Sequence, residues 1–175
     1  GVLCSLDTEH HIELAEKLCE IVPCGERVRF TGSGSEATLH ALRLCRAASG
    51  RAKIIRFRGH FHGYHELAYI GGHPPADQLD ASPPYRESAG IPAAMAELII
   101  PVEYNNAEEL ERTVAKHRDE VGVILIEPVD FNCGCMLPEP GFLELARRLA
   151  DETGMILFFD EIQSFAKKSP GGAQQ

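Results

Sequence analysis

The sequence predicts an α/β protein in which helices cover both faces of a mostly parallel sheet. Segments with strand patterns alternate with amphipathic helical segments, and the later strands are continuous apolar runs, as expected of strands buried on both faces. The composition, 44% hydrophobic and 25% charged over 175 residues, is that of an ordinary folded protein. We expect residues 1–175 to form a single domain, because no repeat, low-complexity segment or linker divides them.

The chain begins with a helical pattern. Residues 10–21 carry apolar side chains at near-helical spacing, and Pro23-Cys24-Gly25 ends the run. A short strand is predicted at residues 28–30.

A turn and a second helix come next. Residues 32–34 form a tight turn, and residues 36–48 form a helix. Its predicted buried side consists of Ala37, Ala41, Leu44, Cys45 and Ala48. Gly50 is a typical residue for the helix carboxyl cap.

The remainder alternates regularly after one long interruption. Residues 53–57 form a strand, and residues 59–92, rich in Gly, Pro and His, form a long loop that belongs near a functional site or a subunit contact. The later elements are a strand at 97–100, a helix at 107–117, a strand at 121–126, a helix at 141–152 and a strand at 155–159.

Charge and composition exclude several classes of partner. A net charge of -9 predicts no binding to nucleic acid or to an anionic membrane. The longest apolar run, residues 155–159, is too short to span a bilayer, and the first residues lack a signal-peptide pattern, so a cytoplasmic protein with reduced thiols is expected. Neither Cys133-Gly134-Cys135 nor the histidine-rich tract 60–65 has the ligand spacing of a zinc site, so we predict no metal.

Gly32-Ser33-Gly34-Ser35 follows a predicted strand and opens a helix. Backbone amides, two hydroxyls and the positive end of the helix dipole therefore converge on one point, which favours an anion such as phosphate. A plain helix cap, with Ser35 as the N-cap residue, is an equally good interpretation of the motif alone.

Further polar residues end the predicted strands, where ligands bind in open α/β sheets. Asp160 follows the most apolar strand, and a buried acid there needs a cationic or hydrogen-bonding partner, for example a protonated pyridine nitrogen. A turn-capping Asp is the plainer alternative. Glu127 ends the neighbouring strand, and Phe61 and His62 lie in the Gly-rich loop, where Phe61 could stack on a planar ligand.

Five ordered motifs together resemble those of class III aminotransferases, and most closely glutamate-1-semialdehyde aminomutase-like members. They lie at residues 29–37, 57–63, 126–129, 140–143 and 159–163. The resemblance implies part of the large domain of a fold-type I enzyme that depends on pyridoxal 5'-phosphate (PLP). It also implies amino-group transfer between a small-molecule donor and a carbonyl acceptor, and a homodimer.

The resemblance also implies roles for individual residues. Ser33, Gly34 and Ser35 would bind the PLP phosphate. Phe61 would stack on the pyridine ring with His62 beside it, Asp160 would pair with the ring nitrogen, and Gln163 would approach the ring hydroxyl. Glu127 would face the substrate.

The chain departs from the family pattern at three places. Gly32 stands where Asn is usual, and Ser164-Phe165-Ala166-Lys167 replaces the usual Thr-Gly-Phe-Arg, which removes a turn glycine and a bidentate cation. The Schiff-base lysine of the family is expected beyond residue 175, and Lys167 and Lys168 are expected to be solvated. We therefore expect a partial domain that is inactive alone.

Three alternatives remain open. Gly32-x-Gly34-x-x-Ala37 also fits a dinucleotide fingerprint, and Arg56 or Arg58 would suit NADP. The missing lysine would also fit a truncated or non-catalytic protein of the same fold. Within PLP enzymes, the fold also supports racemisation and decarboxylation.

Overall fold

A computed structural model describes residues 8–167 and 169–174, and these form two compact units. One unit is Gly32–Asp160. The other combines the described residues of the two chain ends, up to Thr31 and from Glu161.

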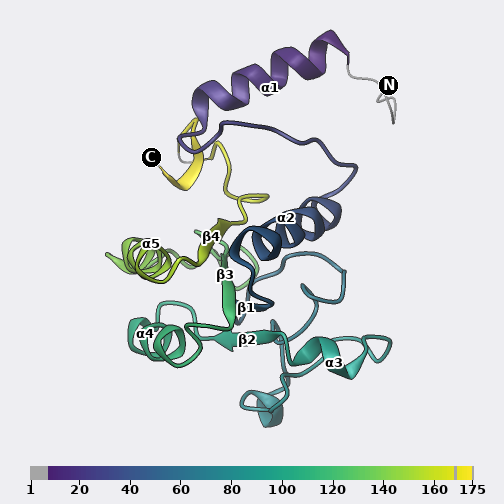
Figure 1. Cartoon of the computed structure of the whole chain (residues 1–175), viewed down its shortest axis with the longest axis vertical. Helices are drawn as coiled ribbons and strands as arrows, with labels where there is room; N and C mark the ends of the chain where they lie inside the picture. The colour runs from purple at the N-terminus through teal and green to yellow at the C-terminus, as the bar shows by residue number, and fades with distance from the viewer. Residues whose placement is uncertain (1–7, 168, 175) are drawn as a thin grey trace. The chain divides into compact units, whose positions relative to one another are not determined.

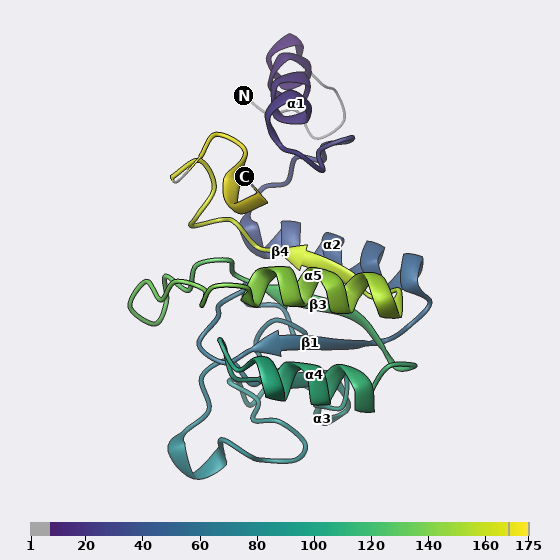
Figure 2. The ribbon, with the colours of Figure 1, turned by 90° about the vertical axis from the view of Figure 1, so that its left-hand side faces the viewer.

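A four-stranded sheet forms the centre of the unit Gly32–Asp160. Its strands are β1 (Lys53–Phe57), β2 (Ile99–Val102), β3 (Val121–Ile126) and β4 (Ile156–Phe159). They lie in the order β2-β1-β3-β4, and every neighbouring pair is parallel. The predicted fold class is confirmed, and Figure 2 shows β1 and β4 as arrows that point the same way.

Helices lie on both faces of this sheet (Figure 1). They are α2 (Gly34–Ser49), α3 (Ala93–Ala96), α4 (Ala107–Lys116) and α5 (Phe142–Thr153). Apolar residues of α4 and α5, such as Leu110 and Ala146, pack with Ile124 on one face, whereas Leu42 of α2 and Ala96 of α3 belong to the core on the other. Every residue of β3 is buried, which explains its unbroken apolar sequence.

Two connecting segments of this unit, the long loop after β1 and the turn after α2, agree with the sequence prediction. Residues 59–92, predicted to be a loop, contain only a 3-10 turn, Ala76–Gln78, and an isolated bridge between Ile70 and Arg86. Gly50 caps α2 in the left-handed conformation with φ 69°, as predicted.

Four details of the prediction are wrong. Residues 28–30 have no strand conformation, because a three-residue run finds no strand to pair with among the described residues. The strand expected at 97–100 lies at Ile99–Val102, because α3 and a turn occupy the preceding residues. Leu44, at 67% exposed, and Ala48 do not lie on the buried side of α2, which Thr38 and Leu42 define. The N-cap of α2 is Ser33 and not Ser35.

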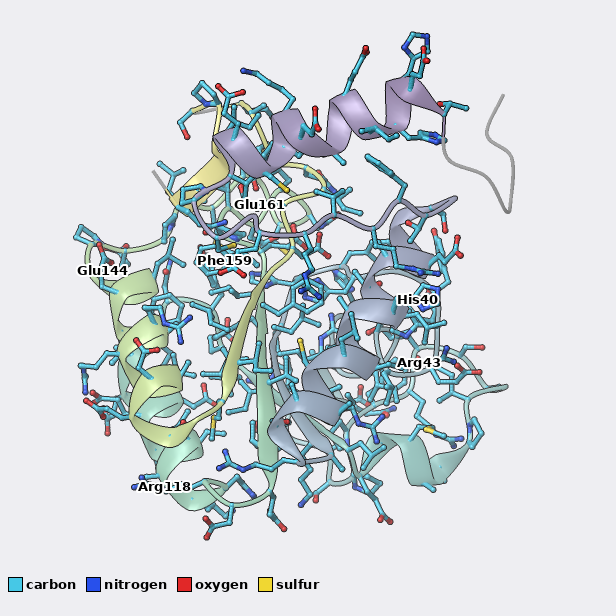
Figure 3. All side chains as sticks on the ribbon, turned by 45° about the horizontal axis from the view of Figure 1, so that its top comes forward. His40, Arg43, Arg118, Glu144, Phe159 and Glu161 are labelled. Carbon is cyan, nitrogen blue, oxygen red and sulfur yellow. The ribbon has the colours of Figure 1, made fainter. Side chains whose placement is uncertain are left out.

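The unit made from the chain ends contains α1 (Glu9–Ile21) and a 3-10 turn, Gly172–Gln174. Thr8 caps α1 by accepting a hydrogen bond from the amide of His11, although none of the helix residues is buried. Glu161, labelled in Figure 3, accepts a hydrogen bond from the amide of Ala173 at 2.8 Å. Across the described residues, no helix has both the length and the apolar character needed to cross a membrane.

Candidate active site

The amino end of α2 presents unpaired backbone donors. Ser33 Oγ accepts a hydrogen bond from the amide of Glu36 at 3.2 Å, and the Glu36 carboxylate accepts one from the amide of Gly32 at 2.8 Å. Within the described residues the amides of Gly34 and Ser35 have no hydrogen-bond partner. These amides lie at the positive end of the helix dipole and can bind an anion.

The loop after β1 packs closely against this helix end. Ser35 Oγ accepts a hydrogen bond from the amide of Tyr64 at 3.2 Å. A Cβ atom on Gly63 would lie 2.6 Å from Ser35 Oγ, and Gly63 has φ 109°, so only glycine permits this approach. Thr38 also donates a hydrogen bond to the carbonyl of His62 at 2.6 Å. The loop residues Phe61 and His62 are thereby fixed relative to α2.

His62 and Asp160 form a buried pair at the carboxyl end of β4. His62 Nδ1 lies 2.8 Å from Asp160 Oδ2, and the two side chains are 0% and 5% exposed. Burial lowers the pKa of His62 to about 4, although the hydrogen bond to Asp160 raises it and Arg56 lowers it further. The imidazole is therefore neutral near pH 7, and its Nε2 atom is buried without a hydrogen-bond partner in the described part of the chain.

Because the His62 imidazole is neutral near pH 7, it brings no positive charge to Asp160. The backbone of Asp160 is held by a hydrogen bond from its amide to the carbonyl of Ile126 at 2.8 Å, which fixes the residue at the edge where β3 and β4 end. A buried carboxylate with a neutral hydrogen-bond donor on one side remains a strong acceptor for a cation.

Glu127 follows the last residue of β3 and binds the backbone of the loop after β1. One of its carboxylate oxygens accepts a hydrogen bond from the amide of Phe61 at 2.6 Å, and Asn132 Nδ2 donates to both oxygens at 2.9 and 3.1 Å. Burial raises the pKa of Glu127 to about 7, and the charges of Asp160 and Asp130 raise it further, against those hydrogen bonds. Its carboxyl group can therefore change protonation near neutral pH.

Two buried residues support the loop in a way that the sequence analysis did not predict. His60 Nδ1 accepts a hydrogen bond from the amide of Glu127 at 3.1 Å, and burial lowers the pKa of His60 to about 2. Arg56 in β1 donates hydrogen bonds to the carbonyls of His60, Ala68 and Ile70. The strand position of Arg56 among apolar neighbours was a usable signal, because a buried arginine needs several acceptors.

The predicted site residues are brought together in part. Ser33, Gly34, Ser35, Phe61, His62, Glu127 and Asp160 all lie in the unit Gly32–Asp160, at the carboxyl ends of its strands or at the start of α2. Phe61 is half-buried, and its ring lies 5.0 Å from that of Tyr64 in an edge-on arrangement. Gln163 belongs to the other unit, so its role stays a prediction. The described residues contain no group of three or more His, Cys, Asp or Glu side chains that could hold a metal ion.

The chain folds as an open α/β protein in which the amino end of α2, with amides that no described residue accepts from, and a buried histidine–aspartate pair lie in the same unit. The sequence model of the family "Aminotransferase class-III" matches residues 2–167. The chain belongs to the class-III aminotransferase family, which confirms the resemblance drawn from the five motifs.

Known relatives extend well beyond the region that they share with this chain. A glutamate-1-semialdehyde 2,1-aminomutase from Methanothermobacter thermautotrophicus is 39% identical over 175 residues, which are 100% of this chain and 40% of that protein. An omega-transaminase from Sphaerobacter thermophilus is 36% identical with a TM-score of 0.86, covering 99% of this chain and 40% of its own. A structure described as a transaminase with PLP bound is 26% identical with a TM-score of 0.85, covering 94% of this chain and 38% of its own. The chain thus spans about 40% of the length of the relatives it matches.

Proposed function

We propose that this chain forms the cofactor-binding part of an enzyme that moves an amino group with the help of PLP. The observation that supports this most is the buried pair of Asp160 with a neutral His62 at the carboxyl ends of the strands. A charged carboxylate that its neighbour does not neutralise suits the protonated ring nitrogen of PLP.

The residues present fit the two charged groups of PLP. The unpaired amides of Gly34 and Ser35, with the Ser33 and Ser35 side chains at the same helix end, suit the phosphate. Asp160 would hold a proton on the ring nitrogen. When bound, PLP supplies an electron sink that makes proton removal next to the amino group feasible.

Other residues would orient the ring and the substrate. Phe61 would stack on the ring, with His62 beside it, and Gln163 would approach the ring hydroxyl. The hydrogen bond from the Phe61 amide to the Glu127 carboxylate fixes the backbone of Phe61. Glu127 would therefore position the Phe61 ring, and it would also face the substrate side of the site.

The reaction would be amino-group transfer on a small molecule. Similarity to the aminomutase favours rearrangement of an amino aldehyde such as glutamate 1-semialdehyde, and similarity to the omega-transaminase favours transfer from an amino donor to a carbonyl acceptor. Incubation with glutamate 1-semialdehyde alone, or with an amine and a 2-oxo acid, distinguishes these two reactions. We further propose a cytoplasmic homodimer that binds neither nucleic acid nor membranes, consistent with the net charge of -9.

PLP binding is tested with the protein as its gene encodes it. We expect saturable binding, followed by absorbance and fluorescence, with at least 10-fold weaker affinity in the double variant Ser33→Ala/Ser35→Ala, because two hydroxyls leave the phosphate site. Ser88→Ala, at an exposed loop position, is the matched control and should bind PLP as the parent protein does. Equal affinity in all three proteins would disprove the phosphate assignment, and no PLP binding by the parent protein would disprove the function.

A further inference from the structure

A cavity lies toward the carboxyl-terminal end of α2, away from the candidate active site at the helix amino end. It has a volume of about 410 Å³ and is lined by Arg43, Arg46, Ala47, Gly50, Arg51 and Ala52. These residues end α2 and lead into β1, so the cavity lies at the amino end of β1, whereas the candidate site lies at the carboxyl ends of the strands. We call it the arginine pocket.

The arginine pocket concentrates positive charge in an acidic chain. Arg43 and Arg46 are three residues apart on α2 and therefore neighbours on its surface, and Figure 3 labels Arg43 on this helix. Across residues 8–167 and 169–174, no ion pair or hydrogen bond of either guanidinium is found. None of the residues lining the cavity is acidic, although the chain has a net charge of -9.

Arg51 is held in place by the backbone. Its Nη1 atom donates hydrogen bonds to the carbonyls of Val121 at 3.2 Å and Thr153 at 2.9 Å. These bonds hold the Arg51 guanidinium at the start of β3 and the end of α5, so Arg51 adds fixed positive charge near the pocket. Two further guanidinium groups remain able to turn toward an anion.

The helix end does not cancel this charge. The carboxyl end of a helix dipole corresponds to about half a negative charge, whereas three guanidinium groups carry three positive charges. The neighbouring side chains are small, and a Cβ atom on Gly50 would meet no atom within 4 Å, so the cavity stays open.

The side chains that line the arginine pocket indicate which kind of ligand it can bind. The lining side chains offer only hydrogen-bond donors from guanidinium groups, with no aromatic face and no carboxylate or hydroxyl acceptor. Guanidinium groups match phosphate oxygens in bidentate geometry. We propose that the arginine pocket binds a small molecule that carries a phosphate chain or a phosphate ester.

This site is separate from the proposed PLP phosphate site. The two lie at opposite ends of α2, a helix of 16 residues, and such a helix is about 24 Å long. Both sites can therefore be occupied together, and each can be removed by substitution without touching the other.

The test is calorimetric titration of the protein as its gene encodes it, saturated with PLP beforehand. The probes are inorganic pyrophosphate, ATP and glucose 6-phosphate, and their relative affinities distinguish a free phosphate chain, a nucleotide and a sugar phosphate. We expect at least one to bind, with affinity that falls as salt is added. Arg43→Ala/Arg46→Ala should weaken that binding at least 10-fold.

A double variant with the same charge change is the control. Arg112→Ala/Lys116→Ala removes two exposed positive charges from α4, outside the pocket, and should bind the probe like the parent protein. Absence of binding for all three probes, or equal weakening in both double variants, would overturn the proposal. Binding that is lost in Ser33→Ala/Ser35→Ala and kept in the pocket variant would overturn it too, because the probe would then occupy the α2 amino end.

Discussion

Asp160 receives no positive charge from its buried partner His62, because burial holds that imidazole neutral near pH 7. In the PLP-loaded protein as its gene encodes it, we expect Asp160→Asn to lower turnover about 100-fold or more, because an amide cannot hold a proton on the ring nitrogen as a carboxylate does. The fold should survive, because an amide of the same shape can still accept a hydrogen bond from His62. Steady-state kinetics and circular dichroism measure the two effects.

Asp77→Asn is the matched control for this prediction, since Asp77 lies exposed in the 3-10 turn of the long loop. It should leave turnover unchanged. If Asp160→Asn kept turnover within a few-fold of the parent protein, the role of Asp160 at the ring nitrogen would be wrong.

Glu127 links protonation to stability at the same edge. Burial raises its pKa from 4.5 to about 7 in the folded chain. As the pH rises, the unfolded chain therefore loses this proton first, and the folded state loses stability between about pH 4.5 and 7. Glu127→Gln cannot ionise, so we expect its stability relative to the parent protein to rise by up to about 3 kcal/mol between pH 5 and pH 8.

Urea unfolding at pH 5, 6, 7 and 8 measures this difference. Other titrating groups are common to both proteins and cancel in the comparison. Glu144→Gln removes an exposed carboxyl group from α5 and should show no such trend. A constant difference between Glu127→Gln and the parent protein across this pH range would contradict the assigned pKa.

At the level of elements, the regular part of the sheet was predictable and its irregular surroundings were not. Unbroken apolar runs identified β3 and β4 because such runs suit strands covered on both faces. Residues 28–30, Val-Arg-Phe, have apolar residues at alternate positions, but a strand also needs a partner that local sequence does not specify. Leu44 was misassigned because the stripe of α2 that faces the sheet is set by packing, and Thr38 occupies it.

In the candidate site, too, some residues could be predicted from local sequence and others could not. Ser33, Gly34, Ser35 and Asp160 follow from rules about helix ends and strand ends, which are local. The contacts of Glu127 with Phe61 and of His60 with Glu127 join residues 66 and 67 positions apart, and no spacing in the sequence encodes them.

The loop after β1 depends on Arg56, whose guanidinium is bound by three loop carbonyls, those of His60, Ala68 and Ile70. Arg56→Met would leave these buried acceptors unsatisfied, so we expect a loss of about 3 kcal/mol or more of unfolding free energy. The loop should also exchange its amide hydrogens faster, and PLP should bind more weakly, because Phe61 and His62 lie in it.

Hydrogen exchange and urea unfolding test this, with Arg112→Met as control. Arg112 is exposed on α4 and makes no hydrogen bond or ion pair within the described residues, so its loss should change stability by less than about 0.5 kcal/mol. Equal effects of the two substitutions would show that Arg56 does not anchor the loop.

At the scale of the whole molecule, buried titrating groups oppose one another in their pH dependence. Burial lowers the pKa of His60 to about 2 and that of His62 to about 4, from 6.5 for an ordinary histidine. Below pH 6.5 the unfolded chain takes up protons that the folded chain cannot, so the stability that these residues contribute is complete above about pH 6.5 and is lost on acidification. Glu127 acts in the opposite direction over the same range.

The combined effect of His60 and His62 on stability should exceed the opposite effect of Glu127. When the pH falls from 7 to 5, the two histidines together lower the free energy of unfolding by about 4 kcal/mol. Protonation of Glu127 raises it by about 2 kcal/mol, so the protein should lose about 2 kcal/mol of stability. His60→Gln keeps an acceptor for the Glu127 amide but cannot titrate, so this loss should nearly vanish in the variant. His10→Gln, at a side chain that is 93% exposed, should lose stability on acidification as the parent protein does. Urea midpoints at pH 5 and pH 7 for the three proteins decide the question, because equal acid sensitivity in all of them would mean that His60 is protonated in the folded state.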